Sequence, residues 1–287
     1  MVSVLLTRIS STTRCVRKDN AMNQPVISII TVTFNAANVV EKTIQSVVSQ
    51  TYDKLEYLII DGASKDNTMD IVDRYRDQIE RRGRIVSEPD KGLYDAMNKG
   101  ASLATGDWVL FMNADDEFID SNVVADVAAF IEKHPEADIV FGNTEQIWDY
   151  GTVLSAPTEA CVNHKMCSSP QASFVKKTVH ESHPFELRYR YASDFEQFIS
   201  FVQEGKVFVH FDRLISRIRL NSGVTYDNHY ASATEIYNIL LDRGFDVRKE
   251  KARKLRNIKL VSSFRKYMPK WVSNPVFRML AKYYKAM

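Results

Sequence analysis

The chain has 287 residues, of which 45% are hydrophobic, and a net charge of +2 at pH 7. These values are typical of a soluble globular protein with one large domain, or with one domain and an appendage. No apolar run approaches about 18 residues, so the sequence predicts no membrane-spanning helix. The three cysteines form no CxxC pair and leave an odd count, which argues against a disulfide framework and favours a reducing compartment.

The first 24 residues are predicted to be a disordered leader. A short apolar patch at 2–6 precedes the basic residues of this segment, which is the reverse of the order in a secretory signal peptide. We therefore expect the folded domain to cover 25–228 and a basic helical extension to cover 229–287.

From residue 26 to 142 the chain alternates between buried strands and amphipathic helices. Runs of β-branched and apolar residues, as expected for parallel strands covered on both faces, predict strands at 26–34, 55–60, 84–87, 108–112 and 138–141. Apolar residues three or four positions apart predict four helices between them, with core positions that include Val40, Ile71, Met97 and Val127.

Two local signals set the bounds of these helices. Ser64 or Asp66 is expected to cap the second helix, which should continue through Tyr75 and Ile79, and Gly106 is expected to end the third. The whole alternation predicts a doubly wound α/β architecture of the nucleotide-binding type.

The second half of the chain is less regular. Residues 150–169 are predicted to be irregular, and a helix follows with Phe195, Phe198 and Ile199 on its apolar face. A short strand is predicted at 207–211, and basic helices are expected after Tyr230.

Polar residues follow three of the predicted parallel strands. These are Asn35 after Phe34, Asp61, and the adjacent pair Asp115 and Asp116. The carboxyl ends of parallel strands converge on one crevice, where folds of this type keep their ligands. Two adjacent carboxylates repel each other unless a positive charge lies beside them, so a divalent metal that holds a phosphate is one interpretation. The alternative is an ordinary turn with a helix N-cap.

The glycine pattern argues against two common nucleotide-binding classes. The chain has only 10 glycines and contains neither GxGxxG nor GxxxxGK[ST]. A dinucleotide oxidoreductase and a P-loop NTPase are therefore disfavoured.

At five places the chain resembles the inverting family 2 glycosyltransferases. The stretches are SIITVTFN (28–35), IDGASKDNT (60–68), SEPDKGLYDAMNKG (87–100), TGD (105–107) and NADD (113–116), in the order and spacing of that family. The third stretch is similar to the bacterial polysaccharide, O-antigen and colanic acid branch. The resemblance covers about 25–226 and implies a GT-A fold, a mainly parallel α/β sheet flanked by helices. It also implies transfer of a sugar from a nucleoside-diphosphate sugar.

The resemblance places a metal and diphosphate site at 113–116. Asp115 and Asp116 match the family's acidic motif, with Asn113 where many members have its first Asp. They are expected to hold Mg²⁺ or Mn²⁺ bridging the diphosphate, and Asn113 and Asp115 to contact the donor. The metal would neutralise the charge that develops on the leaving nucleoside diphosphate.

The same resemblance assigns a donor-binding role to residues on three other strand ends. Thr33 and Phe34 lie at the end of the first strand, where Phe34 is expected to stack on the nucleobase. Asp61 matches the first Asp of the family's base-binding turn, and Gly62 stands where many members have the second. Asp90 and Lys91 match positions near the base or phosphates. A core aromatic and a solvated loop lysine are the alternatives for Phe34 and Lys91.

Three residues of the second half complete the expected site. Asp194 resembles the family's catalytic Asp and is expected to take the proton of the acceptor hydroxyl; a helix N-cap is the alternative. Gln171 is expected to line the acceptor side, and Arg219 to close over the diphosphate. The QxxRW signature of processive synthases is absent, which favours one sugar per cycle.

The C-terminal end is strongly basic. Residues 243–287 contain 14 lysines and arginines and only two acidic residues. A basic amphipathic helix with Val276, Leu280 and Tyr283 suits an anionic membrane surface, and a helix packed on the core is the alternative. With the polyprenyl-linked acceptors typical of the branch, this predicts a cytoplasmic enzyme on the inner membrane surface. No nucleic-acid recognition motif accompanies the charges.

Two other functions remain open from the sequence. A sugar-1-phosphate nucleotidyltransferase shares a similar sheet but needs a glycine-rich loop after the first strand, where this chain has TVTFN at 31–35. A non-catalytic module that binds nucleotide sugars is the alternative from another class, and the presence of Asp115, Asp116 and Asp194 argues against it.

Overall fold

The computed structural model describes residues 24–148, 151–156, 169–220 and 228–267. Side chains are described as far as Lys259. The predicted leader (except for its last residue) and the amphipathic helix expected around Val276 lie outside these residues.

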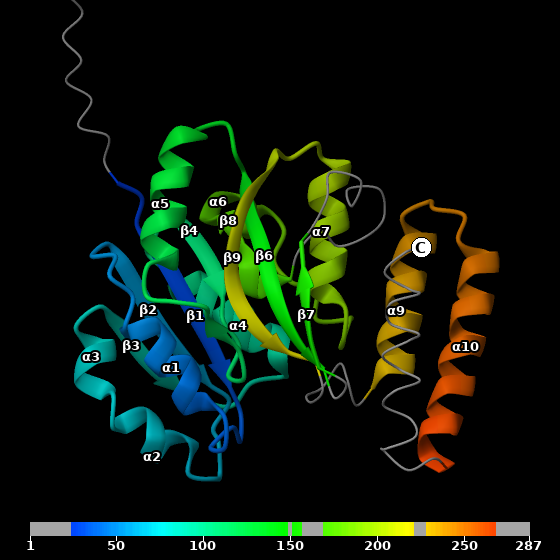
Figure 1. The fold of residues 1–287 in the computed structure, drawn as a ribbon, viewed down its shortest axis with the longest axis horizontal. Coiled ribbons are helices and arrows are strands. Elements are labelled where there is room, and N and C mark those ends of the chain that lie inside the picture. The colour runs from blue at the N-terminus through cyan, green and yellow to red at the C-terminus, as the bar shows by residue number, and fades with distance from the viewer. Residues whose placement is uncertain (1–23, 149–150, 157–168, 221–227, 268–287) are drawn as a thin grey trace, which may run out of the picture.

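A mixed sheet of nine strands forms the centre of the molecule (Figure 1). Its order is β3 (Gly83–Ser87), β2 (Leu55–Asp61), β1 (Ile27–Thr33), β4 (Trp108–Phe111), β8 (Ser173–Lys176), β6 (Ile139–Trp148), β9 (Phe208–Arg219) and β5 (Glu117–Phe118), with β7 (Gly151–Ser155) paired to β6. The first four strands of this order are parallel, and β8 pairs antiparallel with both β4 and β6. The predicted α/β fold is confirmed. The sheet, which was expected to be mainly parallel, is parallel from β3 to β4 and mixed beyond β4.

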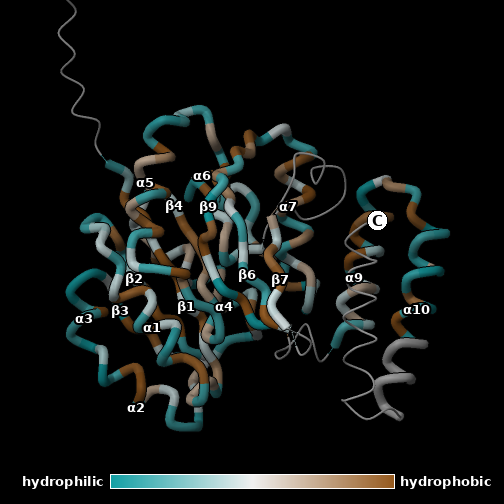
Figure 2. The backbone as a smooth tube through the Cα atoms, in the orientation of Figure 1, coloured by the Kyte–Doolittle hydropathy of each residue, from teal (hydrophilic) through white to brown (hydrophobic). Residues whose placement is uncertain are grey.

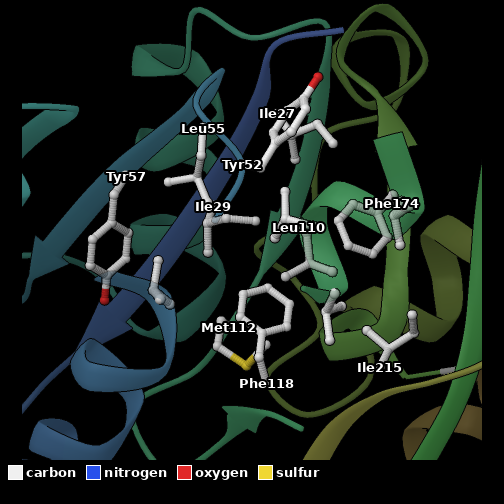
Figure 3. Close-up of a cluster of buried hydrophobic side chains, with 14 of the residues drawn as sticks. Ile27, Ile29, Tyr52, Leu55, Tyr57, Leu110, Met112, Phe118, Phe174 and Ile215 are labelled. Atoms are coloured by element: carbon white, nitrogen blue, oxygen red, sulfur yellow. The ribbon is translucent and has the colours of Figure 1, made fainter. Parts of the chain in front are cut away.

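Strand β1 is buried on both faces because its side chains alternate between two cores. Ile27 and Ile29 join the core under α1 (Val40–Val48) and α5 (Val123–Lys133). Ile30 and Val32 join the opposite core under α4 (Leu93–Leu103). Figure 3 shows the first core, in which Ile29, Leu110 and Phe174 come from β1, β4 and β8. Figure 2 colours the backbone by the hydropathy of each residue, and hydrophobic residues are frequent along the central strands β1 and β4.

The second predicted helix is two helices, α2 (Thr68–Asp73) and α3 (Arg76–Glu80). The break comes at Tyr75, whose hydroxyl donates to Glu41 of α1 and accepts from Gln45. The residue at the N-cap is Asn67 and not the predicted Ser64 or Asp66, and its side chain makes no cap hydrogen bond. The carboxylate of Asp66 nevertheless accepts the backbone N–H of Thr68, the first residue of α2. A contact between helices thus overrides the local periodicity.

Gly106 does not end the third helix as predicted. Helix α4 ends at Leu103, and Ala104 already has an extended backbone. Gly106 lies instead where the chain passes close to β1, and its N–H donates to the hydroxyl of Ser28 at 2.9 Å. A Cβ at this position would lie 2.7 Å from the carbonyl oxygen of Val26, so the glycine permits a close backbone approach.

The second half contains more regular structure than the sequence predicts. β7 lies in the segment predicted to be irregular, and β9 runs to Arg219, beyond the predicted end at 211. β5, β8, α6 (Lys177–Ser182) and the 3-10 helix η2 (Pro170–Ala172) were not predicted. β9 is long because it pairs in parallel with β6 and antiparallel with β5.

The predicted helix around Phe195 is α7 (Ser193–Gln203), and two helices follow, α9 (His229–Asp242) and α10 (Arg248–Tyr267). Of these, α10 is basic as predicted, whereas α9 contains no lysine or arginine and is therefore not basic. α9 and α10 lie side by side in Figure 1. Ile239 and Leu240 of α9 share a third core with Phe195 and Ile199 of α7. None of the helices in the described part of the chain is long and apolar enough to cross a membrane.

Candidate active site

The carboxyl ends of β1, β2, β3 and β4 meet at one edge of the sheet. The pairing register places Thr33 opposite Asp61 and Asp61 opposite Ser87, all in parallel strands. The predicted convergence of Phe34, Asp61 and the segment after β4 is therefore confirmed. Two oxygens at this edge, Oγ1 of Thr33 and Oδ1 of Asn113, are buried and have no hydrogen-bond partner among the described residues.

Asp61 is held rigidly at the end of β2. Its carboxylate is fully buried and accepts the backbone N–H of Ser64 at 3.0 Å and the hydroxyl of Ser87 at 2.6 Å. The hydroxyl of Ser64 accepts the backbone N–H of Asn35, a residue with φ of 49°. The bonds of Asp61 and Ser64 therefore tie the loops after β1, β2 and β3 to one another.

Phe34, Gly62 and Asp90 lie together beside Asp61. Phe34 is 59% exposed, which is unusual for a phenylalanine at the end of a central strand. A Cβ on Gly62 would lie 3.3 Å from the ring of Phe34 and would collide with the carboxylate of Asp90. The carboxylate of Asp90 thus occupies the space that a side chain at 62 would need. Lys91 follows on the same loop, and its side chain is exposed.

Asp115 and Asp116 differ in their surroundings. Asp115 forms an ion pair with Arg219 at 3.2 Å. Asp116 is buried and accepts the backbone N–H of Arg219 at 3.1 Å and a hydrogen bond from Gln171. Burial raises the pKa of Asp116 to about 7, although these hydrogen bonds oppose the shift. The structure therefore brings Arg219 and Gln171, which the sequence placed on the donor and acceptor sides, to the same pair of carboxylates.

The residues after β4 suit a hard divalent cation. Asp115, Asp116 and the unpartnered Oδ1 of Asn113 are oxygen ligands, the type that Mg²⁺ and Mn²⁺ prefer. In the described ranges no group of three or more His, Cys, Asp or Glu side chains could hold a metal. Mg²⁺ is usually bound by one or two carboxylates together with substrate phosphates, and two carboxylates are present here.

Asp194 stands at the start of α7, on a different element from the acidic pair. It is partly buried, and its Oδ1 accepts the hydroxyl of Tyr94 and the N–H of Phe195, each at 2.9 Å. Burial raises the pKa of Asp194 above its ordinary value, and the hydrogen bond from Tyr94 opposes this shift. A carboxylate with a raised pKa is a stronger base than an exposed one and is suited to take a proton from a hydroxyl.

Two residues of the SEPDKGLYDAMNKG stretch lie on helix α4 and hold other parts of the site in place. Tyr94 and Asn98 lie four residues apart and therefore on one face of the helix. Tyr94 holds Asp194, while the amide of Asn98 exchanges two hydrogen bonds with the backbone of Phe185, at 2.8 and 2.9 Å. The sequence reasoning missed both residues, and the only signal for them was their place in the resembling stretch.

Helix α9 holds the segment before Asp194 from the other side. The carboxylate of Glu235 accepts the backbone N–H groups of Arg190 at 3.1 Å and Tyr191 at 2.7 Å. Nearby, Arg243 pairs with the buried Glu196 of α7. Asp194 is thus positioned by α4 and α9, and neither contact follows from local sequence.

Comparisons with known proteins agree with this geometry. Residues 28–193 match the sequence pattern of the family described as "Glycosyl transferase family 2". A "PGL/p-HBAD biosynthesis glycosyltransferase" of Mycobacterium bovis is 35% identical over 181 residues, which are 61% of this chain and 69% of that protein. The "Putative teichuronic acid biosynthesis glycosyltransferase TuaG" of Bacillus subtilis is 35% identical over 95 residues, 33% of this chain and 38% of that protein.

Two solved structures share the fold. TarS of S. aureus, residues 1–349 with UDP, matches 80% of this chain and 69% of its own with a TM-score of 0.60 and 19% identity. The mannosyltransferase PcManGT of Pyrobaculum calidifontis, with GDP-Man and Mn²⁺, matches 77% of this chain and 65% of its own with a TM-score of 0.62 and 17% identity. The predicted GT-A type of fold is therefore confirmed.

Proposed function

The chain belongs to glycosyltransferase family 2 and is a glycosyltransferase, and from this premise we propose that it transfers one sugar per cycle, with inversion, from a nucleoside-diphosphate sugar. The observation that supports this most is the separation of two groups of carboxylates. Asp61, Asp115 and Asp116 gather at the ends of parallel strands, whereas Asp194 stands at the start of α7 with its own partners. The first group suits a donor, and the second suits a base.

The donor would lie across the ends of β1, β2 and β4. The exposed ring of Phe34 offers a surface on which a nucleobase stacks, and the carboxylate of Asp90 lies beside it. Asp61, buried at the end of β2, would hold the turn that carries this surface. Lys91 and Arg219 would contact the phosphates, together with Thr33 and Asn113. Solved structures of the same fold contain UDP, UDP-GlcNAc or GDP-Man, which supports a nucleotide sugar without choosing its base.

Asp115 and Asp116 would hold Mg²⁺ or Mn²⁺. When bound, the cation would neutralise charge on the leaving diphosphate. Because Arg219 already pairs with Asp115 and bonds to Asp116 through its N–H, it lies where it could also contact the diphosphate.

Asp194 would act as the general base. The acceptor oxygen forms a bond to the anomeric carbon while the bond from that carbon to the diphosphate oxygen breaks, and the hydroxyl proton passes to Asp194. The nucleoside diphosphate leaves with the electron pair of the broken bond. Attack from the face opposite the leaving group inverts the anomeric centre. Tyr94 would keep the carboxylate aimed at the acceptor.

We further propose a polyprenyl-linked saccharide as acceptor, in the synthesis of a surface polysaccharide such as an O-antigen or exopolysaccharide. Relatives named for glycolipid and teichuronic acid synthesis support an acceptor of this kind. Gln171 of η2 would lie between donor and acceptor, because η2 adjoins both Asp116 and the segment near Asp194. The basic segment 243–287, which includes α10, would bring the enzyme to the cytoplasmic face of the inner membrane.

Family membership favours sugar transfer over a nucleotidyltransferase or a binding module, and a donor screen tests this directly. The purified chain is incubated with Mn²⁺ and a panel of UDP-, GDP- and dTDP-sugars, and unfolding temperature and released nucleotide are measured. We expect one base to stabilise the protein and its sugar nucleotide to be turned over slowly in water. Turnover that yields a nucleoside triphosphate from a sugar nucleotide and pyrophosphate would support the nucleotidyltransferase instead.

A further inference from the structure

A hollow of about 40 Å³ lies beside Asp194. Residues of α7 and of strands β4, β6, β8 and β9 line it, and most of them are apolar. Six are phenylalanines: Phe111, Phe141, Phe185, Phe198, Phe201 and Phe208. No step of the proposed transfer uses this hollow.

The hollow reaches the active-site edge of the sheet. Asp194, the proposed base, lies on its wall, and so does Pro170 of η2. Phe111 is the last residue of β4 and comes two positions before Asn113. A molecule that presents a hydroxyl to Asp194 therefore has part of its surface over this hollow.

The walls of the hollow are rigid and offer few hydrogen-bond partners to a water molecule. The rings of Phe111 and Phe185, and those of Phe198 and Phe208, make edge contacts with centroids 5.2 Å apart. Apart from Asp194, the polar lining residues are already engaged. Ser173 gives its hydroxyl proton to the carbonyl of Ser169, and Gln197 directs its amide nitrogen to His180 and to the carbonyl of His183. A buried water needs two to four polar partners, so an apolar group suits the hollow better.

The volume of the hollow admits only a small chemical group. An apolar cavity of about 150 Å³ holds one benzene molecule, so 40 Å³ is too small for an aromatic ring or a lipid chain. It matches a single methyl group. We propose that the hollow is an acceptor subsite that receives one methyl substituent of the acceptor sugar, next to the hydroxyl that Asp194 deprotonates. This inference rests on the proposed function.

A sugar can carry such a methyl group in two ways, at C6 of a 6-deoxy sugar or in an N-acetyl group. Octyl glycosides, used as acceptors in matched pairs, distinguish these two positions of the methyl group. The pairs are quinovose against glucose, D-fucose against D-galactose, and N-acetylglucosamine against glucosamine. With the donor found in the screen, we expect the methyl-bearing member of at least one pair to have a kcat/KM about four- to tenfold higher, the gain from burying one methyl group. Equal use, or preference for the hydroxyl or amine member in every pair, would overturn the proposal.

Two conservative variants test whether this preference comes from the hollow. Val175 of β8 lines it, so Val175→Leu narrows the hollow and should abolish the preference, while Val175→Ala widens it. Val127→Leu, in the core on the opposite face of the sheet, is the matched control and should keep the preference. If Val127→Leu removed it as well, the effect would be one of stability and the proposal would fail.

A measurement without any acceptor keeps the inference separate from the proposed function. Crystals of the full chain are pressurised with xenon, which enters dry apolar cavities. We expect a xenon atom between Phe198, Phe208 and Val175, and its loss in Val175→Leu. Ordered water in that place would overturn the inference even if the donor screen succeeded. Xenon binding with a failed donor screen would confirm the dry apolar hollow but overturn the proposed function, and with it the role of the hollow as an acceptor subsite.

Discussion

Two parts of the active site, around Asp61 and around Asp194, are held by contacts that span very different distances along the chain. On the donor side, the fully buried Asp61 is bonded by Ser64, three residues away. On the base side, Tyr94 and Asp194 are 100 residues apart, and Glu235 and Tyr191 are 44 apart. The part of the donor side around Asp61 is thus built from turns at strand ends, although Asp116 takes a partner from Arg219, 103 residues away. The base side depends on α4, α7 and α9 packing correctly.

This contrast predicts that substitutions on the two sides will impair the enzyme in different ways. Damage on the donor side should weaken nucleotide binding and leave the fold intact. Damage to the contacts around Asp194 should lower the rate of transfer and leave nucleotide binding nearly unchanged.

On the donor side, the largest effect is expected from Asp116→Asn. Removing one of the two carboxylates that would hold the cation should weaken Mn²⁺-dependent nucleotide binding by about 100-fold. Isothermal titration with the nucleoside diphosphate, with and without Mn²⁺, measures this. Asp120→Asn is the matched control, because Asp120 pairs with Arg213 outside the site. Unchanged Mn²⁺-dependent binding in Asp116→Asn would remove Asp116 from the metal site.

Tyr94→Phe should have the next largest effect. A hydrogen bond to a charged group contributes about 1.5–3 kcal/mol, so kcat should fall by about 10- to 100-fold with little change in KM for the donor. The bond from Tyr94 lowers the pKa of Asp194, so its loss raises that pKa further. The base is active when deprotonated, and the acid limb of the pH–rate profile should therefore move to higher pH.

Tyr75→Phe is the control for this variant, since it removes a tyrosine hydroxyl that bonds only to α1. A fall in kcat without a shift of the acid limb would mean that Tyr94 acts through packing alone.

Glu235→Ala tests the contact from α9. Two backbone N–H groups would lose their acceptor, and we expect kcat to fall about three- to tenfold while the donor dissociation constant stays the same. Glu235→Gln keeps one acceptor oxygen and should recover part of the rate. Glu250→Ala, an exposed glutamate of α10, is the control. Wild-type rates in Glu235→Ala would show that α9 does not position the base.

The smallest effect concerns His180, which is buried against Phe111 and Phe185 on the base side. Burial lowers its pKa to about 4. Between that value and its unfolded pKa of about 6.5, the unfolded chain binds more protons than the folded one, so stability falls as the pH drops through this window. His180→Asn should remove about 1–2 kcal/mol of the stability lost between pH 7 and pH 5, as measured by urea unfolding. If His134→Asn, at a more exposed site, did the same, His180 would not be the cause.

The same contrast between local and long-range contacts explains how much of the fold and of the site could be predicted from sequence. The strands up to β4 and the grouping of Asp61 with the segment after β4 follow from apolar runs and strand ends, which are local signals. β8 is only four residues long and lies between β4 and β6, so its place depends on its neighbours. The partners of Asp194 could not be predicted, because Tyr94 and Glu235 reach it only after α4 and α9 have packed. Likewise, the sequence gives no sign that the carboxylate of Asp90 fills the space beside Gly62.

Asp194→Asn tests the central claim, that binding of the donor and removal of the proton belong to separate sides of one site. Transfer and the dissociation constant of the sugar nucleotide with Mn²⁺ are measured on the same preparation. We expect kcat to fall by about 100- to 10,000-fold, the contribution of a general base, and the dissociation constant to stay within about twofold. Normal transfer would show that Asp194 is not the base, and an equal loss of donor binding would show that the two sides are not separate.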